Sequence, residues 1–314
     1  MSSMRNSWHG VYSAITTKFG AKQEVDLNAV RADVDFQLEG GVHGIVCCGS
    51  LGEASTLTSR EKMTITEAVV ERVDGRVPVI LTIAEDSTRV AATLAADAQQ
   101  LGVSGLMVLP AMRYAATDRE VIAYYRTIAG AGDLDIMIYN NPIAYGIDVR
   151  PEMLVELADE PRFVALKESS GDPRRLTDIH NLVGDRYALF TGVDDLALES
   201  LMLGAVGWVA GLVCAFPKET VAIYNLALEG RFAEARDIYR WFTPLLHLDV
   251  SPRFVQYIKL TEHLARGTSP TVRAPRLDLP DEEKRFVTEI VRTALTKRPD
   301  LGPYGPLSKS PGAA

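Results

Sequence analysis

The chain alternates between short apolar runs and longer segments in which apolar residues recur with helical spacing. Short apolar runs predict buried strands, whereas recurrence every three or four positions predicts amphipathic helices. The predicted strands are 11–17, 44–48, 78–83, 105–109, 135–139, 163–167, 187–191 and 207–210. The helices predicted to follow them are 26–39, 59–73 with Ser59 as N-cap, 87–100, 118–129, 150–158, 173–182, 194–203 and 218–228.

Repeated strand–helix units predict an α/β protein, specifically a closed parallel (β/α)8 TIM barrel. An open doubly wound sheet is the weaker alternative, because no glycine-rich phosphate turn follows the first predicted strand. Segments 232–242, 253–266 and 282–295 have helical spacing and predict a C-terminal helical extension. We therefore expect a catalytic barrel over residues 1–225, a helical region over 226–296 and a poorly ordered tail over 297–314.

The charge balance is mildly acidic, with 33 Lys and Arg residues against 41 Asp and Glu residues. No run of basic residues indicates a nucleic-acid partner, and no apolar run is long enough to cross a bilayer. The first ten residues lack the apolar core of a signal peptide. These features predict a cytoplasmic protein that acts on a small molecule, without a nucleic-acid or membrane partner.

The three cysteines do not indicate a disulfide or a metal site. Cys47 and Cys48 are neighbours in a predicted strand, so their side chains should point to opposite faces. That arrangement is poor geometry for either role. The five histidines are scattered without metal-ligand spacing. Buried thiols and ordinary surface histidines are therefore the expected interpretation.

The sixth predicted strand ends in a lysine, Lys167, directly before a polar turn. Burying an ammonium ion without a partner is costly, and desolvation lowers the pKa of a lysine. A neutral amine can attack a ketone or imine carbon and form a Schiff base. The alternative is that Lys167 reaches solvent or pairs with a carboxylate.

The other predicted strand ends also carry polar and glycine residues, and barrel active sites form at these ends. A tyrosine near the lysine could relay protons, and the Gly49–Gly52 turn with the Ser50 hydroxyl could hold a substrate carboxylate. The alternative for the turn is a plain loop with Glu53 solvated. The candidate site residues are Lys167 and Tyr139 for catalysis, and Thr16, Thr17, Gly49, Ser50, Leu51, Asn141, Gly192 and Ala210 for substrate binding.

Three motifs together resemble a known family. The turn 49–53, the Tyr139-Asn140-x-Pro142 turn and the Lys167 strand occur in the order and spacing of the class I aldolase family of dihydrodipicolinate synthase and N-acetylneuraminate lyase. The resemblance covers about residues 8–295. It implies a barrel with a C-terminal helical region, a homotetramer and no cofactor. It also implies that Lys167 is the Schiff-base lysine, that Tyr139 relays protons, and that Ser50 with the following backbone binds the substrate carboxylate.

Three departures from the synthases bear on the substrate. Leu51 stands where synthases usually have a second threonine, Ala111-Met112 replaces an aromatic pair, and Ala144 replaces the arginine that binds a substrate carboxylate. By position alone, the candidates that could replace this arginine are Asn141, Ser169 and the segment 191–194.

Within the family, the chain is most similar to the deaminases that act on 1-pyrroline-4-hydroxy-2-carboxylate, in stretches 48–53, 167–175, 246–249 and 256–260. That similarity predicts conversion of this cyclic imine to 2,5-dioxopentanoate and ammonia, in hydroxyproline degradation. The alternative enzyme is a Schiff-base aldolase, dehydratase or synthase acting on pyruvate or a 2-keto sugar acid. A non-enzymatic, ligand-sensing barrel with an idle Lys167 is a third possibility.

Overall fold

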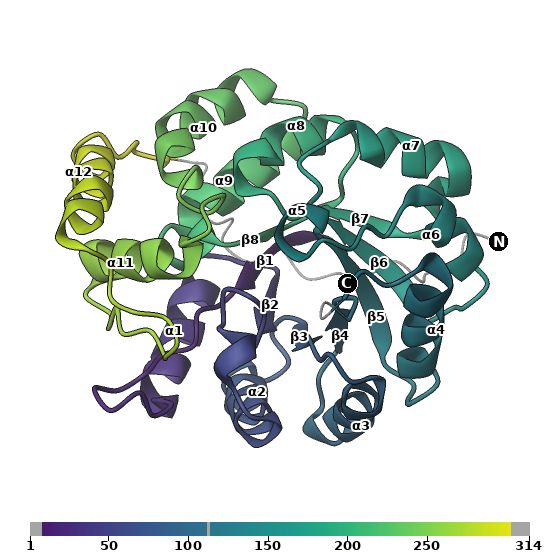
Figure 1. The fold of residues 1–314 in the computed structure, drawn as a ribbon. Helices are drawn as coiled ribbons and strands as arrows, with labels where there is room; N and C mark the ends of the chain where they lie inside the picture. The colour runs from purple at the N-terminus through teal and green to yellow at the C-terminus, as the bar shows by residue number, and fades with distance from the viewer. Residues whose placement is uncertain (1–7, 112–113, 303–314) are drawn as a thin grey trace, which may run out of the picture.

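The computed structural model describes residues 8–111 and 114–302. Its centre is a closed barrel of parallel strands, each hydrogen-bonded to the next in chain order, with the last pairing the first (Figure 1). The predicted TIM barrel is therefore confirmed. The strands are β1 (Gly10–Ala14), β2 (Gly44–Cys47), β3 (Val79–Ile83), β4 (Gly105–Val108), β5 (Asp135–Asn140), β6 (Phe163–Glu168), β7 (Ala188–Thr191) and β8 (Gly207–Ala210).

Helices surround the barrel, and the last three form the predicted C-terminal extension on one side (Figure 1). The helices are α1 (Leu27–Glu39), α2 (Ser59–Val73), α3 (Thr88–Ala98), α4 (Asp118–Ala129), α5 (Pro142–Tyr145), α6 (Pro151–Leu157), α7 (Arg174–Val183), α8 (Ala197–Met202), α9 (Pro217–Leu228), α10 (Phe232–Leu246), α11 (Phe254–Arg266) and α12 (Asp281–Thr296). Short 3-10 turns are η1 (Ala54–Thr56), η2 (Gln99–Leu101), η3 (Gly184–Arg186), η4 (Asp194–Leu196) and η5 (Leu212–Cys214).

Most predicted element bounds agree with the structure within a few residues, and the differences have local causes. The N-cap of α2 is Thr58 rather than Ser59, because Thr58 and Glu61 form a reciprocal capping box. The predicted helix 194–203 is divided into η4 and α8. The predicted end of the barrel at residue 225 falls inside α9, which continues to Leu228. Of the predicted tail 297–314, residues 303–314 lie outside the described part.

The strands are buried on both faces, as expected for a barrel filled with side chains and covered by helices. Inside the barrel, the rings of Tyr12 and Phe190 pack edge to face, with centroids 5.1 Å apart. Both rings are fully buried and belong to the hydrophobic core inside the barrel. Among the described helices, none is long and apolar enough to cross a membrane.

Candidate active site

The carboxyl ends of the strands surround a cavity of about 620 Å³. Eight of the ten residues predicted for the site line it: Gly49, Ser50, Leu51, Tyr139, Asn141, Lys167, Gly192 and Ala210. They come from the ends of β2, β5, β6, β7 and β8 and from the loops that follow. The barrel topology thus brings together residues that are far apart in the sequence.

Lys167 is buried at the end of β6, with 7% of its surface exposed. Its Nζ lies 4.2 Å from the centroid of the Tyr139 ring, and it forms no ion pair with any described residue. Lys167 is therefore neither solvated nor paired with a carboxylate. Burial lowers the pKa of Lys167, while the charges of Asp249, Tyr145 and Asp194 oppose that effect in part. The net lowering favours the neutral amine that Schiff-base chemistry requires.

Gly192 makes the room in which the Lys167 side chain lies. A Cβ placed on Gly192 would be 2.3 Å from Cε of Lys167 and 2.2 Å from Oγ of Ser169. Real Cβ atoms do not approach other atoms so closely, so a larger residue would displace the lysine. The contribution of Gly192 to the site is therefore the space that its missing side chain leaves.

Tyr139 is the partner of Lys167 in the β5–β6 register, so the two side chains are neighbours on adjacent strands. The next register pair along these strands is Asn140 and Glu168, and Asn140 Nδ2 donates a hydrogen bond to Glu168 Oε2 at 3.1 Å. Asn141 Nδ2 donates to the Tyr139 hydroxyl at 3.2 Å, which fixes the orientation of the hydroxyl. Burial raises the pKa of Tyr139, so the phenol is protonated and can donate a proton.

Tyr145 also lines the cavity, and sequence reasoning missed it. Its hydroxyl forms a hydrogen bond with Ser50 Oγ, and its ring meets the Tyr139 ring edge to face at 6.1 Å. Tyr145 is placed there by α5, in which Asn141 is the N-cap and Pro142 the first residue. An Asn-Pro pair is a known helix-start signal, and it could have indicated that a helical turn carries Tyr145 back over the site.

The glycine turn after β2 has an unusual backbone. Cys48 and Glu53, which flank it, both have left-handed conformations, with φ of 57° and 58°. Such conformations cost energy in residues other than glycine and persist where the surroundings enforce them. They aim the turn, with Ser50 and Leu51, into the cavity. A strained, cavity-facing turn of this kind has backbone N–H groups available to a substrate carboxylate.

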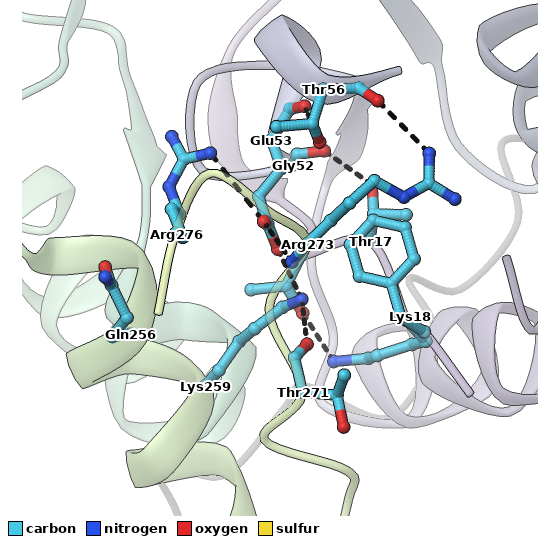
Figure 2. Close-up of polar contacts among 12 residues, drawn as sticks. Thr17, Lys18, Gly52, Glu53, Thr56, Gln256, Lys259, Thr271, Arg273 and Arg276 are labelled. Carbon is cyan, nitrogen blue, oxygen red and sulfur yellow. Dashed lines mark hydrogen bonds and ion pairs between the residues drawn. The ribbon is translucent and has the colours of Figure 1, made fainter. Parts of the chain in front are cut away.

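Glu53 is fully buried, so the alternative in which the turn is a plain loop with Glu53 solvated is wrong. Lys259 Nζ donates to Glu53 Oε1 at 2.5 Å, and the backbone N–H of Arg273 donates to Oε2 at 3.0 Å (Figure 2). Arg276 adds a longer ion pair at 3.7 Å. The donors come from α11 and the connection to α12. The C-terminal helical region thus holds the turn in place, which a reading of the local sequence could not reveal.

Thr16 and Thr17 were predicted to bind substrate, but neither lines the cavity. Because β1 ends at Ala14, both residues lie in the following loop. Thr16 Oγ1 donates to Glu262 at 2.8 Å. Thr17 Oγ1 donates to the carbonyl of Gly52 at 2.6 Å (Figure 2). The Thr17 hydroxyl therefore holds the turn, and the Thr16 hydroxyl joins the buried ion cluster of Lys18, Asp33 and Glu262.

Among the candidates for replacing the arginine, Ser169 lines the cavity, and its buried hydroxyl makes no hydrogen bond within the described residues. Asp194 is fully buried and accepts hydrogen bonds from Trp208 Nε1 and from the N–H groups of Gly211 and Leu212. Asp194 therefore supports the loop after β8. Met112 lies outside the described residues.

The three cysteines are free and buried, in agreement with the prediction. Within residues 8–111 and 114–302, no group of three or more His, Cys, Asp or Glu side chains has an arrangement that could hold a metal ion.

Comparison with known proteins identifies the class. The model of the dihydrodipicolinate synthetase family matches residues 7–294. The chain belongs to this family, a family of lyases built on the barrel described above.

Individual relatives cover nearly the whole chain. A 4-hydroxy-tetrahydrodipicolinate synthase of Kosmotoga olearia is 32% identical over 294 residues, covering 92% of this chain and 97% of the relative. A protein described as an uncharacterised DapA-like lyase of Rhizobium meliloti is 32% identical over 277 residues, covering 87% of this chain and 92% of the relative. The crystal structure of the Aquifex aeolicus dihydrodipicolinate synthase is similar with a TM-score of 0.87 at 28% identity, covering 91% of this chain and 98% of that one.

Proposed function

We propose that this protein is a Schiff-base lyase that acts as an aldolase, dehydratase or synthase on pyruvate or another small 2-keto acid, with Lys167 as the nucleophile. The observation that carries the proposal is the buried Lys167 amine, which lies over the Tyr139 ring in an open cavity and has no ion-pair partner among the described residues. The family and the names of its relatives support a lyase of this type.

The chemistry follows from the residue types. The neutral Lys167 amine adds to the C2 carbonyl of the keto acid, and loss of water gives a protonated imine. The imine draws electrons from C3, so a C3 proton leaves and an enamine forms. The enamine then adds to an aldehyde, or expels a hydroxide from C4 that leaves as water after protonation. Water finally attacks C2 and releases Lys167. Tyr139 is positioned to move the protons at the nitrogen and the departing oxygen.

Substrate orientation is assigned to the turn after β2. Gly49, Ser50 and Leu51 line the cavity across the barrel from β6, and their backbone N–H groups and the Ser50 hydroxyl are the donors that would bind a carboxylate. A carboxylate bound there would place C2 of a keto acid toward Lys167. The hydrogen bond between Ser50 and Tyr145 connects this binding turn to the Tyr139 ring pair, giving the site a chain of hydroxyl groups in one subunit.

A second candidate is the deaminase that opens 1-pyrroline-4-hydroxy-2-carboxylate. Leu51 and Ala144, which stand where synthases have a threonine and an arginine, favour it over the synthase reaction itself. Lys167 would attack C2 of the ring and open it. Elimination of the C4 hydroxyl and hydrolysis at both ends would then give 2,5-dioxopentanoate and ammonia, with net consumption of one water. Both candidates use the same lysine and tyrosine.

The two candidates are separated by their products. The purified protein is incubated with pyruvate and an aldehyde acceptor, with a 2-keto-3-deoxy sugar acid, and with freshly made 1-pyrroline-4-hydroxy-2-carboxylate. Carbon–carbon bond formation or dehydration without ammonia supports the first candidate. Ammonia and 2,5-dioxopentanoate, absent with Lys167→Ala, support the second. No product from any of the three substrates contradicts the proposed enzyme and favours a ligand-sensing barrel.

A homotetramer, which the family resemblance implies, and a cytoplasmic location, which the sequence features predict, are part of the same proposal. One similar structure is described as a monomeric dihydrodipicolinate synthase variant, with a TM-score of 0.85 at 26% identity, covering 95% of this chain and 99% of that one. Sedimentation velocity of the full chain tests the assembly: a single species of four times the chain mass supports the tetramer, and a species of one chain mass contradicts it.

A further inference from the structure

The cavity contains a carboxyl group, that of Asp249, to which the proposed lyase reaction gives no role. Asp249 lies in the connection between α10 and α11 and lines the cavity. Its side chain reaches over the end of β8, where Gly211 leaves space for it. A Cβ on Gly211 would lie 2.6 Å from Oδ1 of Asp249. The absence of a side chain at position 211 is therefore what admits the carboxylate to the cavity.

The fold does not use the Asp249 carboxylate. Within the described residues it accepts no hydrogen bond and forms no ion pair. Two nearby carboxylates differ in this respect. Asp194 accepts hydrogen bonds from the Trp208 indole and from the backbone N–H groups of Gly211 and Leu212, and Asp195 pairs with His247 at 2.8 Å. A partly buried carboxylate without donors is costly, so a donor supplied by a ligand would relieve that cost.

The position of Asp249 relates it to the reacting atoms. The Asp249 charge opposes the effect of burial on the pKa of Lys167, while burial and the charge of Asp194 raise the pKa of Asp249 and the charge of Lys167 lowers it. Around the barrel, β7, β8 and β1 separate β6, which carries Lys167, from β2, which carries the Ser50 turn. Asp249, over the end of β8, therefore lines the cavity on the rim between Lys167 and the turn.

We propose that Asp249 is a specificity-determining residue that accepts a hydrogen bond from a hydroxyl or amine donor on the substrate, near the imine carbon. The substrate class is then a 2-keto acid, or its cyclic imine, that carries such a donor at C4, rather than pyruvate alone. This inference depends on the proposed function, because it assumes that the substrate is bound to Lys167.

The test uses two keto acids that differ by one hydroxyl, 2-oxobutanoate and 4-hydroxy-2-oxobutanoate. Each is titrated against the full-length protein with borohydride, and the trapped fraction is measured by intact mass. We expect the wild type to be trapped at about 10- to 100-fold lower concentrations of the hydroxylated acid, the ratio that corresponds to one hydrogen bond to a charged group. Asp249→Ala should lose this preference, so that its half-saturation concentrations for the two acids become similar.

Asp195→Asn is the matched control, because it removes a neighbouring carboxylate charge outside the cavity lining and should keep the preference. Asp249→Asn gives an independent readout. Without the negative charge, the pKa of Lys167 falls, so the pH at which trapping by 2-oxobutanoate becomes half-maximal should move lower. A residue with a merely structural role would not cause this shift.

The outcomes separate the two proposals. If neither acid is trapped by the wild type, the proposed function fails, and this inference fails with it. If both acids are trapped equally by the wild type, or if Asp249→Ala keeps the preference, the role of Asp249 is overturned while the Lys167 chemistry stands. The wild-type preference can be measured even if the alanine variant does not fold, so a missing preference alone refutes the inference.

Discussion

The Lys167 amine lies 4.2 Å from the centroid of the Tyr139 ring, and the two residues are register partners on adjacent strands. The contact positions a nucleophile and a proton donor with little freedom, because both belong to the barrel rather than to a mobile loop. The face of the ring attracts the ammonium form of the lysine through a cation–π contact.

Replacing Gly192 by alanine should reduce imine formation strongly while the barrel still folds. The new Cβ would overlap the Lys167 side chain, so the amine would be displaced from the Tyr139 ring. We expect at least a tenfold loss, since a displacement of about 1 Å costs on the order of 100-fold in catalysis. Gly130→Ala is the control, because a Cβ at Gly130 meets nothing closer than 3.4 Å. Equal trapping rates for the two variants would refute this role of Gly192.

Tyr145 and Ser50 should behave as one unit in proton transfer. Each of Tyr145→Phe and Ser50→Ala removes the same hydrogen bond, so the double variant should lose little more kcat than the worse single variant. Loss of a proton-transfer group typically lowers kcat by about 100-fold or more, and we expect at least a tenfold loss here. The measurement is kcat for the four proteins on the substrate identified by product analysis. Additive losses would show that the two hydroxyls act independently.

The buried pair of Glu53 and Lys259 should be important for stability. Lys259→Met would leave a fully buried carboxylate with only Arg273 and Arg276 as partners, and removal of one member of a buried pair costs about 3–5 kcal/mol. Urea unfolding measures the free energy of unfolding. Arg72→Ala, which removes an exposed pair with Asp35, is the control and should change stability little. A similar small change for both variants would contradict the role given to Lys259.

Imine formation should depend on pH through Lys167. The neutral amine attacks, so the rate rises with pH until the lysine is deprotonated. Because burial lowers the pKa of Lys167 below its ordinary value of 10.5, the half-maximal rate should lie below that pH. The measurement is the initial rate of pyruvate trapping over a pH series at constant ionic strength. A half-maximal pH at or above that of an ordinary lysine would mean that burial does not activate this residue.

The sequence was sufficient for the barrel, because each strand is a local apolar run and each helix a local periodic segment. It also located Lys167, Tyr139 and the turn around Ser50, since barrel topology places strand ends at one rim. Thr16 and Thr17 do not line the cavity, because β1 ends at Ala14 and their hydroxyls in the following loop donate to Glu262 and to the carbonyl of Gly52.

The rest of the site depends on contacts between distant segments. Glu53 and Lys259 are separated by 206 positions, and nothing near Glu53 indicates that it is buried against a lysine. Asp249 enters the cavity from the C-terminal region only because Gly211 has no side chain. Such packing relationships leave no periodic pattern in the sequence, so they become visible only when the chain is folded.

The most direct test of the account is reductive trapping of the Schiff base on Lys167. The wild type and Lys167→Ala are incubated with pyruvate and borohydride, and the modified residue is located by peptide mass spectrometry. The account predicts an adduct on Lys167 in the wild type and no adduct in the variant, which should remain folded. An adduct on another lysine, or the same adduct yield in both proteins, would contradict the assignment of Lys167 as the nucleophile.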